Sequence, residues 1–474
     1  MDRAAADRTR VGAATVGADW NGAVLVRTWA RLLALDLRRL TRSAGTAAAI
    51  ILLLALGIYA AWRAGRNVEA ARASLTAAEV AYDDQLDFLL SVYPPTTDAG
   101  EVLYYLAFPA PQPATPVSSL ARGRAAVETE SLRIRLLALE GQLYEHETVN
   151  PRLAAAGYLD LAFLLIALLP LFIIAVSYDL ISGEREGGTW NLVRLFAPPR
   201  RLLIAKLASR AILVGAVAAV VMAAGALMAG VGLDGRAGWM FALVALHTVF
   251  WFALCLGVAT GNRSSTANAM ILAGTWVVLT ILAPAALSLA NSVLHPVPEA
   301  LELTVQQRQG YHEAWDLPPS ATMESFYRDY PEWSDQEVPE DVFTWGWYYA
   351  MNHRGDQAAR DASRAYREVL RQRDAWARRW SVFAPPLATQ LALDRLARTD
   401  LMAQLDYQDA VRRFHERLKD HFFPHFFATT PIDAVVWDDV PTFEPAAPAD
   451  SAARAGFPAA IVLILGSGLA LGVG

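Results

Sequence analysis

The sequence predicts an all-α polytopic membrane protein with six transmembrane helices and a mostly helical outer domain built from two insertions. Hydrophobic residues make up 54% of the 474 residues and charged residues only 19%, whereas a soluble globular protein usually carries about a quarter charged residues. The hydrophobicity is concentrated in six stretches, and no strand-like alternation is sustained between them. This composition disfavours a soluble enzyme, and the net charge of −6 offers no basic patch of the kind that binds nucleic acid.

Six stretches are long and apolar enough to cross a bilayer, which takes about 20 mostly apolar residues. None of them shows the polar stripe of an amphipathic soluble helix. The last stretch is the weakest, because no basic residue follows to anchor it. The six are Thr46–Trp62, Ala154–Ser177, Ala211–Leu233, Gly238–Ala259, Asn268–Ala290 and Gly456–Gly474.

Arginine placement predicts the orientation, because cytoplasmic segments carry the excess of basic residues. Basic residues precede the first span, lie between the second and third spans, and occur in the turn between the fourth and fifth. They include Arg27, Arg31, Arg38, Arg39, Arg42, Arg185, Arg194, Arg200, Arg201, Lys206, Arg210 and Arg263. Both termini are therefore expected on the cytoplasmic side of a bacterial inner membrane. The segments Arg63–Leu153 and Asn291–Ala455 are expected in the periplasm.

The two outer segments are expected to be mostly helical. Prolines are too frequent in Tyr93–Val117 for a helix or a central strand, and Pro431–Asp450 is expected to be extended. The expected helices are Ala70–Leu90, Ser118–Glu147, about Asp356–Trp380 and about Thr399–Phe423.

The most informative segment joins the second and third spans, over residues 178–210. A charged break that contains glycines follows the second span, and Thr189 is placed to cap a short amphipathic helix that ends before Pro198. A short cytoplasmic helix held between two spans is well placed to receive a push from a soluble partner. The alternative is a basic juxtamembrane loop that only sets topology, and the residues alone leave both interpretations open.

The motifs of familiar enzymes are missing from the sequence. There is no GxxxxGK[ST] loop, no HExxH, no GxSxG and no GxGxxG that opens a helix after a strand. The chain is therefore not expected to bind ATP in the P-loop manner or to belong to a familiar hydrolytic class.

The run YDLISGEREGGTWNLVRLFAPPRRLLIAKL (Tyr178–Leu207) resembles the signature of bacterial type-2 ABC transporter permeases, in which GER–x–x–GT is followed by leucines, proline, arginine and GK. Here Ala205 stands where the family usually has glycine before the lysine, Lys206. The run is similar to the permease of the copper-site maturation system for nitrous oxide reductase. The segment Ser381–Phe423 resembles the C-terminal part of a permease family with a large periplasmic insertion. Together these resemblances cover the second and third spans and the second outer segment, roughly half of the chain.

The resemblance implies a permease that exports a substrate or transmits ATP-driven motion to the periplasm. It is expected to work as a dimer, most simply a homodimer, and to be energised by separate ATP-binding subunits. ATP and Mg²⁺ then belong to those subunits, and no cofactor, metal or catalytic residue is expected on this chain. The family also implies that Glu184–Ala197 is the coupling helix. The candidate coupling residues are Gly183, Glu184, Arg185, Glu186, Gly187, Gly188, Thr189, Trp190, Leu192 and Arg194. The competing hypothesis is a membrane receptor or assembly platform whose outer domain binds a partner without transport.

The cytoplasmic N-terminus, residues 1–45, contains a basic amphipathic stretch at Trp20–Arg42. Such a helix suits the membrane surface and corresponds to the elbow helix that precedes the first span in related permeases. A plain topogenic segment is the alternative.

Two ionisable residues lie within the predicted spans, and two prolines are expected to kink spans two and five. Asp160 and His247 could contact a substrate or a proton, but an interhelical hydrogen bond is the commoner role of such groups. The prolines are Pro170 and Pro284.

Two clusters in the second outer segment have a structural and a functional interpretation. His415, His421 and His425 are expected to lie on a polar helix surface rather than to bind a metal, with Pro424 breaking the helix between the last two. The aromatic-rich stretch Tyr311–Tyr349 is expected mainly to pack a loop-rich domain.

Overall fold

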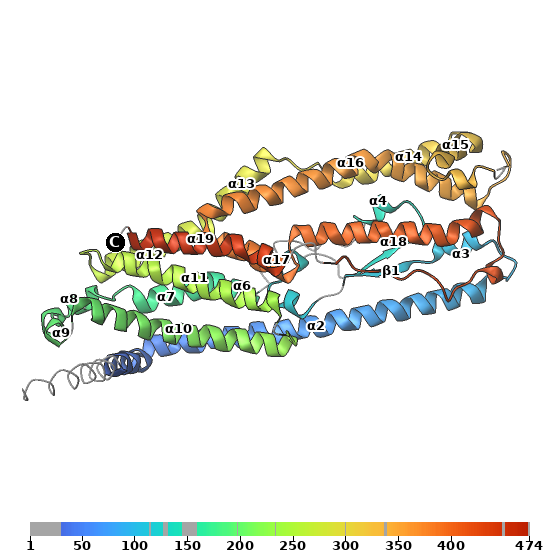
Figure 1. The fold of residues 1–474 in the computed structure, drawn as a ribbon. Helices are drawn as coiled ribbons and strands as arrows, with labels where there is room; N and C mark the ends of the chain where they lie inside the picture. Colours follow the sequence, from blue (N-terminus) through green and yellow to red (C-terminus); the bar gives the residue numbers. More distant parts are fainter. Residues whose placement is uncertain are drawn as a thin grey trace, which may run out of the picture.

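The computed structural model describes residues 30–112, 115–126, 131–144, 159–196, 198–232, 234–298, 300–335, 339–447 and 451–472. The molecule is an elongated assembly of helices (Figure 1). Within the described residues, six helical segments are long and apolar enough to cross a membrane, which confirms the predicted all-α polytopic fold class. They are Ala44–Val92, Leu161–Glu186, Arg201–Ala229, Gly235–Ala259, Ser265–Leu294 and Ala452–Gly472.

The first span belongs to a single helix, α2 (Ala44–Val92), of 49 residues. At 1.5 Å per residue it is about 73 Å long, more than twice the roughly 30 Å of a bilayer's hydrocarbon core. The stretch predicted at Ala70–Leu90 is therefore a direct continuation of the span, because no proline interrupts residues 63–69. Figure 1 shows α2 running along one side of the molecule from the spans into the other helical region, which we call the outer domain after its predicted location.

Two pairs of spans pack closely at glycine residues. Helix α10 (Pro199–Ala229) lies against α2, where a Cβ added at Gly65 would sit 2.7 Å from the carbonyl oxygen of Met228. Helix α11 (Gly235–Ala259) lies against α19 (Ala452–Gly472) in the same manner. Close backbone approach at glycine is typical of helix pairs in membranes.

The second and fifth spans each contain one π-helical stretch, and both stretches end just before a proline. The second span comprises α6 (Leu161–Phe163), η3 (Leu164–Leu168), α7 (Leu169–Ser177) and α8 (Ser182–Glu186). The fifth comprises α12 (Ser265–Val277), η4 (Val278–Leu282) and α13 (Ala283–Leu294). Pro170 and Pro284, the predicted kink positions, follow these π turns. A proline cannot donate to the helix ladder, and a wider π turn is a common local adjustment in membrane helices.

The outer domain has its own core, rich in aromatic side chains, in which Tyr349 stacks on Phe426 with ring centroids 4.1 Å apart. Packing is therefore the main role of the aromatic stretch Tyr311–Tyr349, although Trp315 and Phe343 remain exposed. The helices of this domain are α3 (Ala99–Tyr105), α4 (Leu139–Gln142), α14 (Ala300–Trp315), α15 (Pro319–Asp329), α16 (Trp345–Trp380) and α18 (Leu401–Phe427). A further helix, α17 (Pro385–Ala397), returns to the spans and packs against α11 and α19.

The prediction of a helix over Ser118–Glu147 is wrong. In place of a helix, β1 (Phe108–Pro111) pairs antiparallel with β2 (Ser131–Ile134), and the 3₁₀ turns η1 (Pro116–Ser119) and η2 (Gly123–Ala126) lie between them. Leu132 and Ile134 are buried while Arg133 between them is exposed, which is the period-two pattern of a strand. The prolines of β1 are tolerated because each strand of a two-stranded ribbon is an edge strand.

Candidate coupling site at one end of the membrane bundle

The predicted coupling segment folds into two short helices, α8 at the end of the second span and α9 beyond it. Helix α8 ends at Glu186, a turn at Gly187 and Gly188 follows, and α9 covers Trp190–Phe196. Gly188 has a φ of +69°, a conformation that glycine adopts without strain. Figure 1 places α8 and α9 at the same end of the bundle as the helix over residues 30–42 and the C-terminal end of α19.

Glu184 is the centre of a polar cluster that joins three segments. Its Oε1 accepts hydrogen bonds from Lys206 Nζ of α10 at 2.9 Å and from Arg39 Nη1 of the helix over residues 30–42 at 2.9 Å. Its Oε2 accepts the hydroxyl of Thr189. The side chains of Glu184 and Lys206 are only 12% and 9% exposed, whereas that of Arg39 is 73% exposed. Glu184 therefore ties the turn before α9 to the third span and to the N-terminal helix.

A second buried ion pair joins the N-terminal helix to α10. Arg210 Nη1 lies 2.8 Å from Asp36 Oδ2, and the hydroxyl of Ser209 donates to the same carboxylate oxygen. Arg210 was identified from the sequence only as a basic residue that sets orientation, and Asp36 and Ser209 were not predicted to pair with it. The available signal was one acidic residue among the apolar and basic positions of an amphipathic helix.

The two residues after Glu184 point to a different part of the bundle, the turn between the fourth and fifth spans. Arg185 Nη1 donates to Asn262 Oδ1 at 3.1 Å, and Glu186 Oε1 accepts the backbone N–H of Ser265 at 2.7 Å. The hydroxyl of Ser265 also donates to that of Ser182 at 2.8 Å. Three consecutive charged residues therefore connect the coupling segment to every predicted cytoplasmic segment described by the structure.

Helix α9 projects from this anchored base. The backbone carbonyl of Thr189 accepts the N–H of Val193 at 2.9 Å, as expected of a residue at the start of a helix. The Trp190 ring lies between the guanidinium groups of Arg185 and Arg194, at 5.6 and 6.0 Å from the ring centroid. Leu192 and Leu195 are 57% and 81% exposed. The helix thus presents two leucines to the outside while its base is fixed by polar contacts.

The two intramembrane candidates lie away from this site. Asp160 caps the second span, because its Oδ1 accepts the N–H of Phe163 at 2.7 Å and its Oδ2 accepts the N–H of Arg122 at 3.0 Å. These bonds give Asp160 a structural role at the outer end of the span.

His247 is buried between three helices. Its Nε2 lies 3.2 Å from the carbonyl oxygen of Ile166, and its Nδ1 lies 3.4 Å from the Thr389 hydroxyl of α17. Pro170 has no N–H to offer the carbonyl four residues earlier, which is that of Ile166. These contacts favour the interhelical hydrogen bond over a substrate contact for His247.

The three histidines of α18 do not share one surface. His415 is completely buried, so the expectation of a polar helix surface is wrong for this residue. Burial, and then the charge of Lys419, lowers the pKa of His415 to about 3. Helix α18 also continues through Pro424 to Phe427, contrary to the predicted break. The proline lies in the last turns, where it removes only one hydrogen bond, to the carbonyl of the exposed Asp420.

Two family models match the chain. The one described as "ABC-2 family transporter protein" matches residues 31–335, and the one described as "Domain of unknown function (DUF3526)" matches residues 301–446. No curated protein and no solved structure matches.

The first match includes the coupling segment and five of the six candidate spans. Proteins of this family are membrane subunits that are generally not catalytic themselves, and the family implies pairing with an ATP-binding subunit. Because the match covers more than half of the residues, the chain belongs to the ABC-2 transporter family and is a multi-pass transmembrane subunit of an ABC transporter.

Proposed function

We propose that this chain is the permease of an ATP-driven exporter in a bacterial inner membrane, and that α8 and α9 form its coupling element. The observation that carries this proposal is the combination of a projecting apolar helix and a polar base that contacts several segments. Leu192 and Leu195 offer an apolar contact to a soluble partner, while Glu184 and Arg185 join the base to different parts of the bundle.

A displacement of α9 would be passed on through this base. Ion pairs with little exposed surface are screened less than exposed ones, and short helices move as rigid pieces. The Glu184–Lys206 pair would carry the displacement to α10, and the Arg185–Asn262 bond would carry it to the turn before α12. The helix over residues 30–42, our proposed elbow helix, would follow through Arg39 and Asp36.

The working unit is proposed to be a homodimer of this chain with two ATP-binding subunits that hold ATP and Mg²⁺. The burial of the spans supports a second permease chain. The apolar window of the second span is 72% buried within the chain, whereas that of the fifth span, Ser265–Leu294, is only 6% buried. The fifth span is therefore available to a second copy, and a cysteine replacing Met270, which is 71% exposed, should crosslink two permeases in membranes.

The outer domain is proposed to lie in the periplasm and to gate the exit or hand cargo to a partner. The continuous helix α2 supports this proposal, because it runs without a break from the first span, which packs against α10, to the outer core. The resemblance of Tyr178–Leu207 to the permease that serves the copper site of nitrous oxide reductase also fits a role directed at the periplasm.

The direct test is association with the cognate ATP-binding subunit. The double variant Leu192→Asp/Leu195→Asp should lose co-purification of that subunit, because two carboxylates would have to be desolvated at the contact. Asn191→Asp, which adds a carboxylate to an exposed position of the same helix, is the matched control and should retain association.

Equal co-purification of the double variant, or ATP hydrolysis by the purified permease alone, would overturn the proposal. Association without any transport, with purified cargo candidates or lipids, would instead support a receptor or assembly platform.

A further inference from the structure

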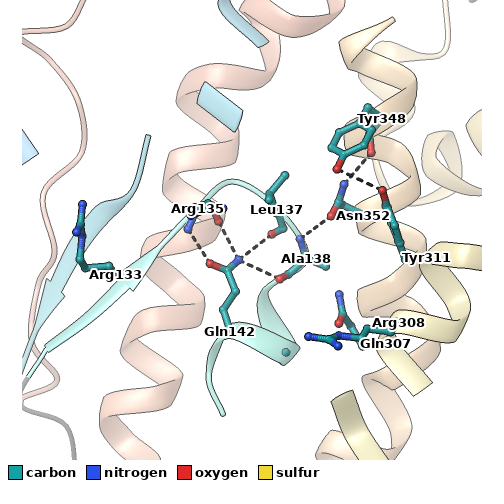
Figure 2. Close-up of a pocket in the computed structure, with 11 residues that line it drawn as sticks. Arg133, Arg135, Leu137, Ala138, Gln142, Gln307, Arg308, Tyr311, Tyr348 and Asn352 are labelled. Carbon is teal, nitrogen blue, oxygen red and sulfur yellow. Dashed lines mark hydrogen bonds between the residues drawn. The ribbon is translucent and has the colours of Figure 1, made fainter. Parts of the chain in front are cut away.

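A cavity of about 380 Å³ lies in the outer domain between the two insertions (Figure 2). One side is the loop over residues 135–142, and the other is formed by α14 and the start of α16. The volume falls in the range of small-molecule sites, roughly 300–1,000 Å³. The cavity is separate from the coupling site, which lies at the opposite end of the molecule (Figure 1).

The loop side of the cavity is fixed by its own hydrogen bonds. Gln142 Nε2 donates to the carbonyl oxygens of Ala138 at 2.9 Å and Arg135 at 3.2 Å, and Gln142 Oε1 accepts the N–H of Arg135 at 2.8 Å. Asn352 Oδ1 of α16 accepts the N–H of Ala138 at 3.2 Å. Figure 2 shows these bonds closing the loop against α16. The cavity is therefore preformed, which lowers the entropic cost of binding.

One polar side chain in the wall is buried and has no hydrogen-bond partner among the described residues. This is Gln307 of α14, which is 9% exposed. Gly141 makes room for its amide, since a Cβ added there would lie 2.8 Å from Gln307 Oε1. The amide atoms keep some exposure to the cavity, so a ligand there can supply the hydrogen-bond partner that no described residue provides.

The described charged side chains of the lining are positive, and Arg308 also has a partner of its own. Arg133, Arg135 and Arg308 line the cavity, and none of the lining residues that the structure describes is acidic. The nearby carboxylates are already engaged: Glu140 binds Arg412 through two hydrogen bonds of 2.8 and 2.9 Å, and Asp356 accepts two backbone N–H groups.

The arginines come from both insertions, so a ligand between them would contact both. Arg135 and Arg308 stand on opposite sides of the cavity, while Arg133 lies at its edge and donates to Gln85 Oε1 at 2.8 Å. The planar guanidinium fork matches the geometry of a carboxylate or phosphate. Tyr311 donates to the oxygen of Tyr348 at 3.2 Å, and burial raises the pKa of Tyr348 well above its usual range. The tyrosines therefore add neutral hydroxyl groups to the wall.

We infer that this cavity binds a small water-soluble organic oxyanion, with Arg135 and Arg308 holding its charged oxygens and the Gln307 amide holding a neighbouring polar group. The ligand class follows from the guanidinium groups, the unpartnered amide and the volume. The inference is independent of the direction of transport and of the docking of an ATP-binding subunit.

The test uses the full chain in nanodiscs of zwitterionic phosphatidylcholine, titrated by calorimetry with citrate and with inorganic phosphate. At least one anion should bind saturably, and the neutral control, glucose, should not. The double variant Arg135→Ala/Arg308→Ala should weaken binding about tenfold or more. Gln307→Leu should weaken it several-fold without a change in charge. Arg328→Ala removes an exposed arginine of α15 outside the cavity and, as the matched control, should leave the affinity unchanged.

Absence of saturable binding for both anions would overturn the inference. An equal loss in Arg328→Ala would also overturn it, because general electrostatic attraction would then explain the binding. Binding seen only with anionic lipid vesicles would show that the ligand is a lipid headgroup rather than a water-soluble anion. This result would also contradict the inference. If the double variant melts at a lower temperature than the parent, the anion affinities of Arg308→Lys and Gln307→Leu test the inference instead. Unchanged affinity in both of these variants would overturn it.

Discussion

Both ends of the molecule contain buried ion pairs, but the structure around the ion pairs differs between the two ends. At the proposed coupling end, Glu184 of the five-residue helix α8 pairs with Lys206 of α10 and with Arg39, and α9 has only seven residues. In the outer domain, Glu140 and Arg412 form a bidentate pair beside long helices that share an aromatic core. Polar contacts therefore hold the coupling element in place, whereas apolar packing holds the outer domain and its ion pairs fix the position of a loop. Substitutions should affect mainly function at the first end and mainly stability at the second.

The largest expected effect is the loss of Arg412. Its partner Glu140 is 12% exposed. Burial acts to raise the pKa of Glu140, but the hydrogen bonds and the charge of Arg412 outweigh burial and hold this pKa below its usual range. Arg412→Met leaves this carboxylate unpaired and should destabilise the outer domain by about 3–5 kcal/mol. Thermal unfolding of the purified chain measures the effect. Because the pair itself contributes little net stability, the double variant Glu140→Leu/Arg412→Met should recover much of the loss; no recovery would contradict the explanation.

Next in size is the functional effect of Glu184→Gln. The neutral amide can still accept a hydrogen bond but cannot form the ion pairs with Lys206 and Arg39, so the base of α9 should loosen while the spans stay packed. We expect transport to fall at least tenfold while basal ATP hydrolysis by the complex and membrane insertion are retained. Glu69→Gln is the matched control, since Glu69 forms an exposed pair with Arg66 on α2. A proportional loss of ATP hydrolysis and transport would mean that Glu184 acts on docking rather than on coupling.

A pH dependence distinguishes the outer domain. Burial raises the pKa of Asp356 to about 6, although Lys419 and the N–H groups of Leu139 and Glu140 act in the opposite direction. The folded state therefore binds this proton more tightly than the unfolded state, whose aspartates titrate near pH 4. Protonation of Asp356 therefore adds to the free energy of unfolding. This stabilisation is fully present below about pH 4 and is lost as the pH rises through about 6. Asp356→Asn should flatten the dependence of the melting temperature on pH in this window, whereas Asp361→Asn, at an exposed position of α16, should not.

The smallest expected effect separates the two partners of Glu184. Arg39 is 73% exposed, and exposed ion pairs contribute about 0–1 kcal/mol. Arg39→Ala should therefore change the melting temperature and transport only slightly, whereas Lys206→Met should impair both more strongly. A ranking in the opposite order would show that the N-terminal helix, rather than α10, is the main contact of the coupling segment.

Hydropathy predicted the membrane-spanning helices well, because a span is determined by its own residues. All six candidate spans overlap the predicted stretches. The sequence did not predict that the first span and Ala70–Leu90 form one helix, although the absence of proline between them was visible. It also failed at Ser118–Glu147, where the leucines and the isoleucine fit a helix face and a strand equally well; pairing with Phe108–Pro111, which depends on tertiary structure, decides the outcome.

The sequence predicted which segment forms the candidate site, but not which distant residues this segment contacts. The motif located Glu184, but its partner Arg39 lies 145 positions earlier and Asn262 lies 77 positions after Arg185. Such pairings depend on how the spans pack, which no local pattern contains. The cavity near Gln307 was not predicted for the same reason, since its walls come from two insertions separated by four spans.

The unbroken length of α2 has a mechanical consequence. A straight rod about 73 Å long that pivots near one end by about 5° moves its other end by about 6 Å, roughly four residues of helical rise. Tilts of this size are small compared with the spread of tilts that membrane helices adopt. A small tilt of α2 among the spans would thus produce a larger displacement at the outer core. Leu89, which is buried near the far end of α2, would move by about this distance.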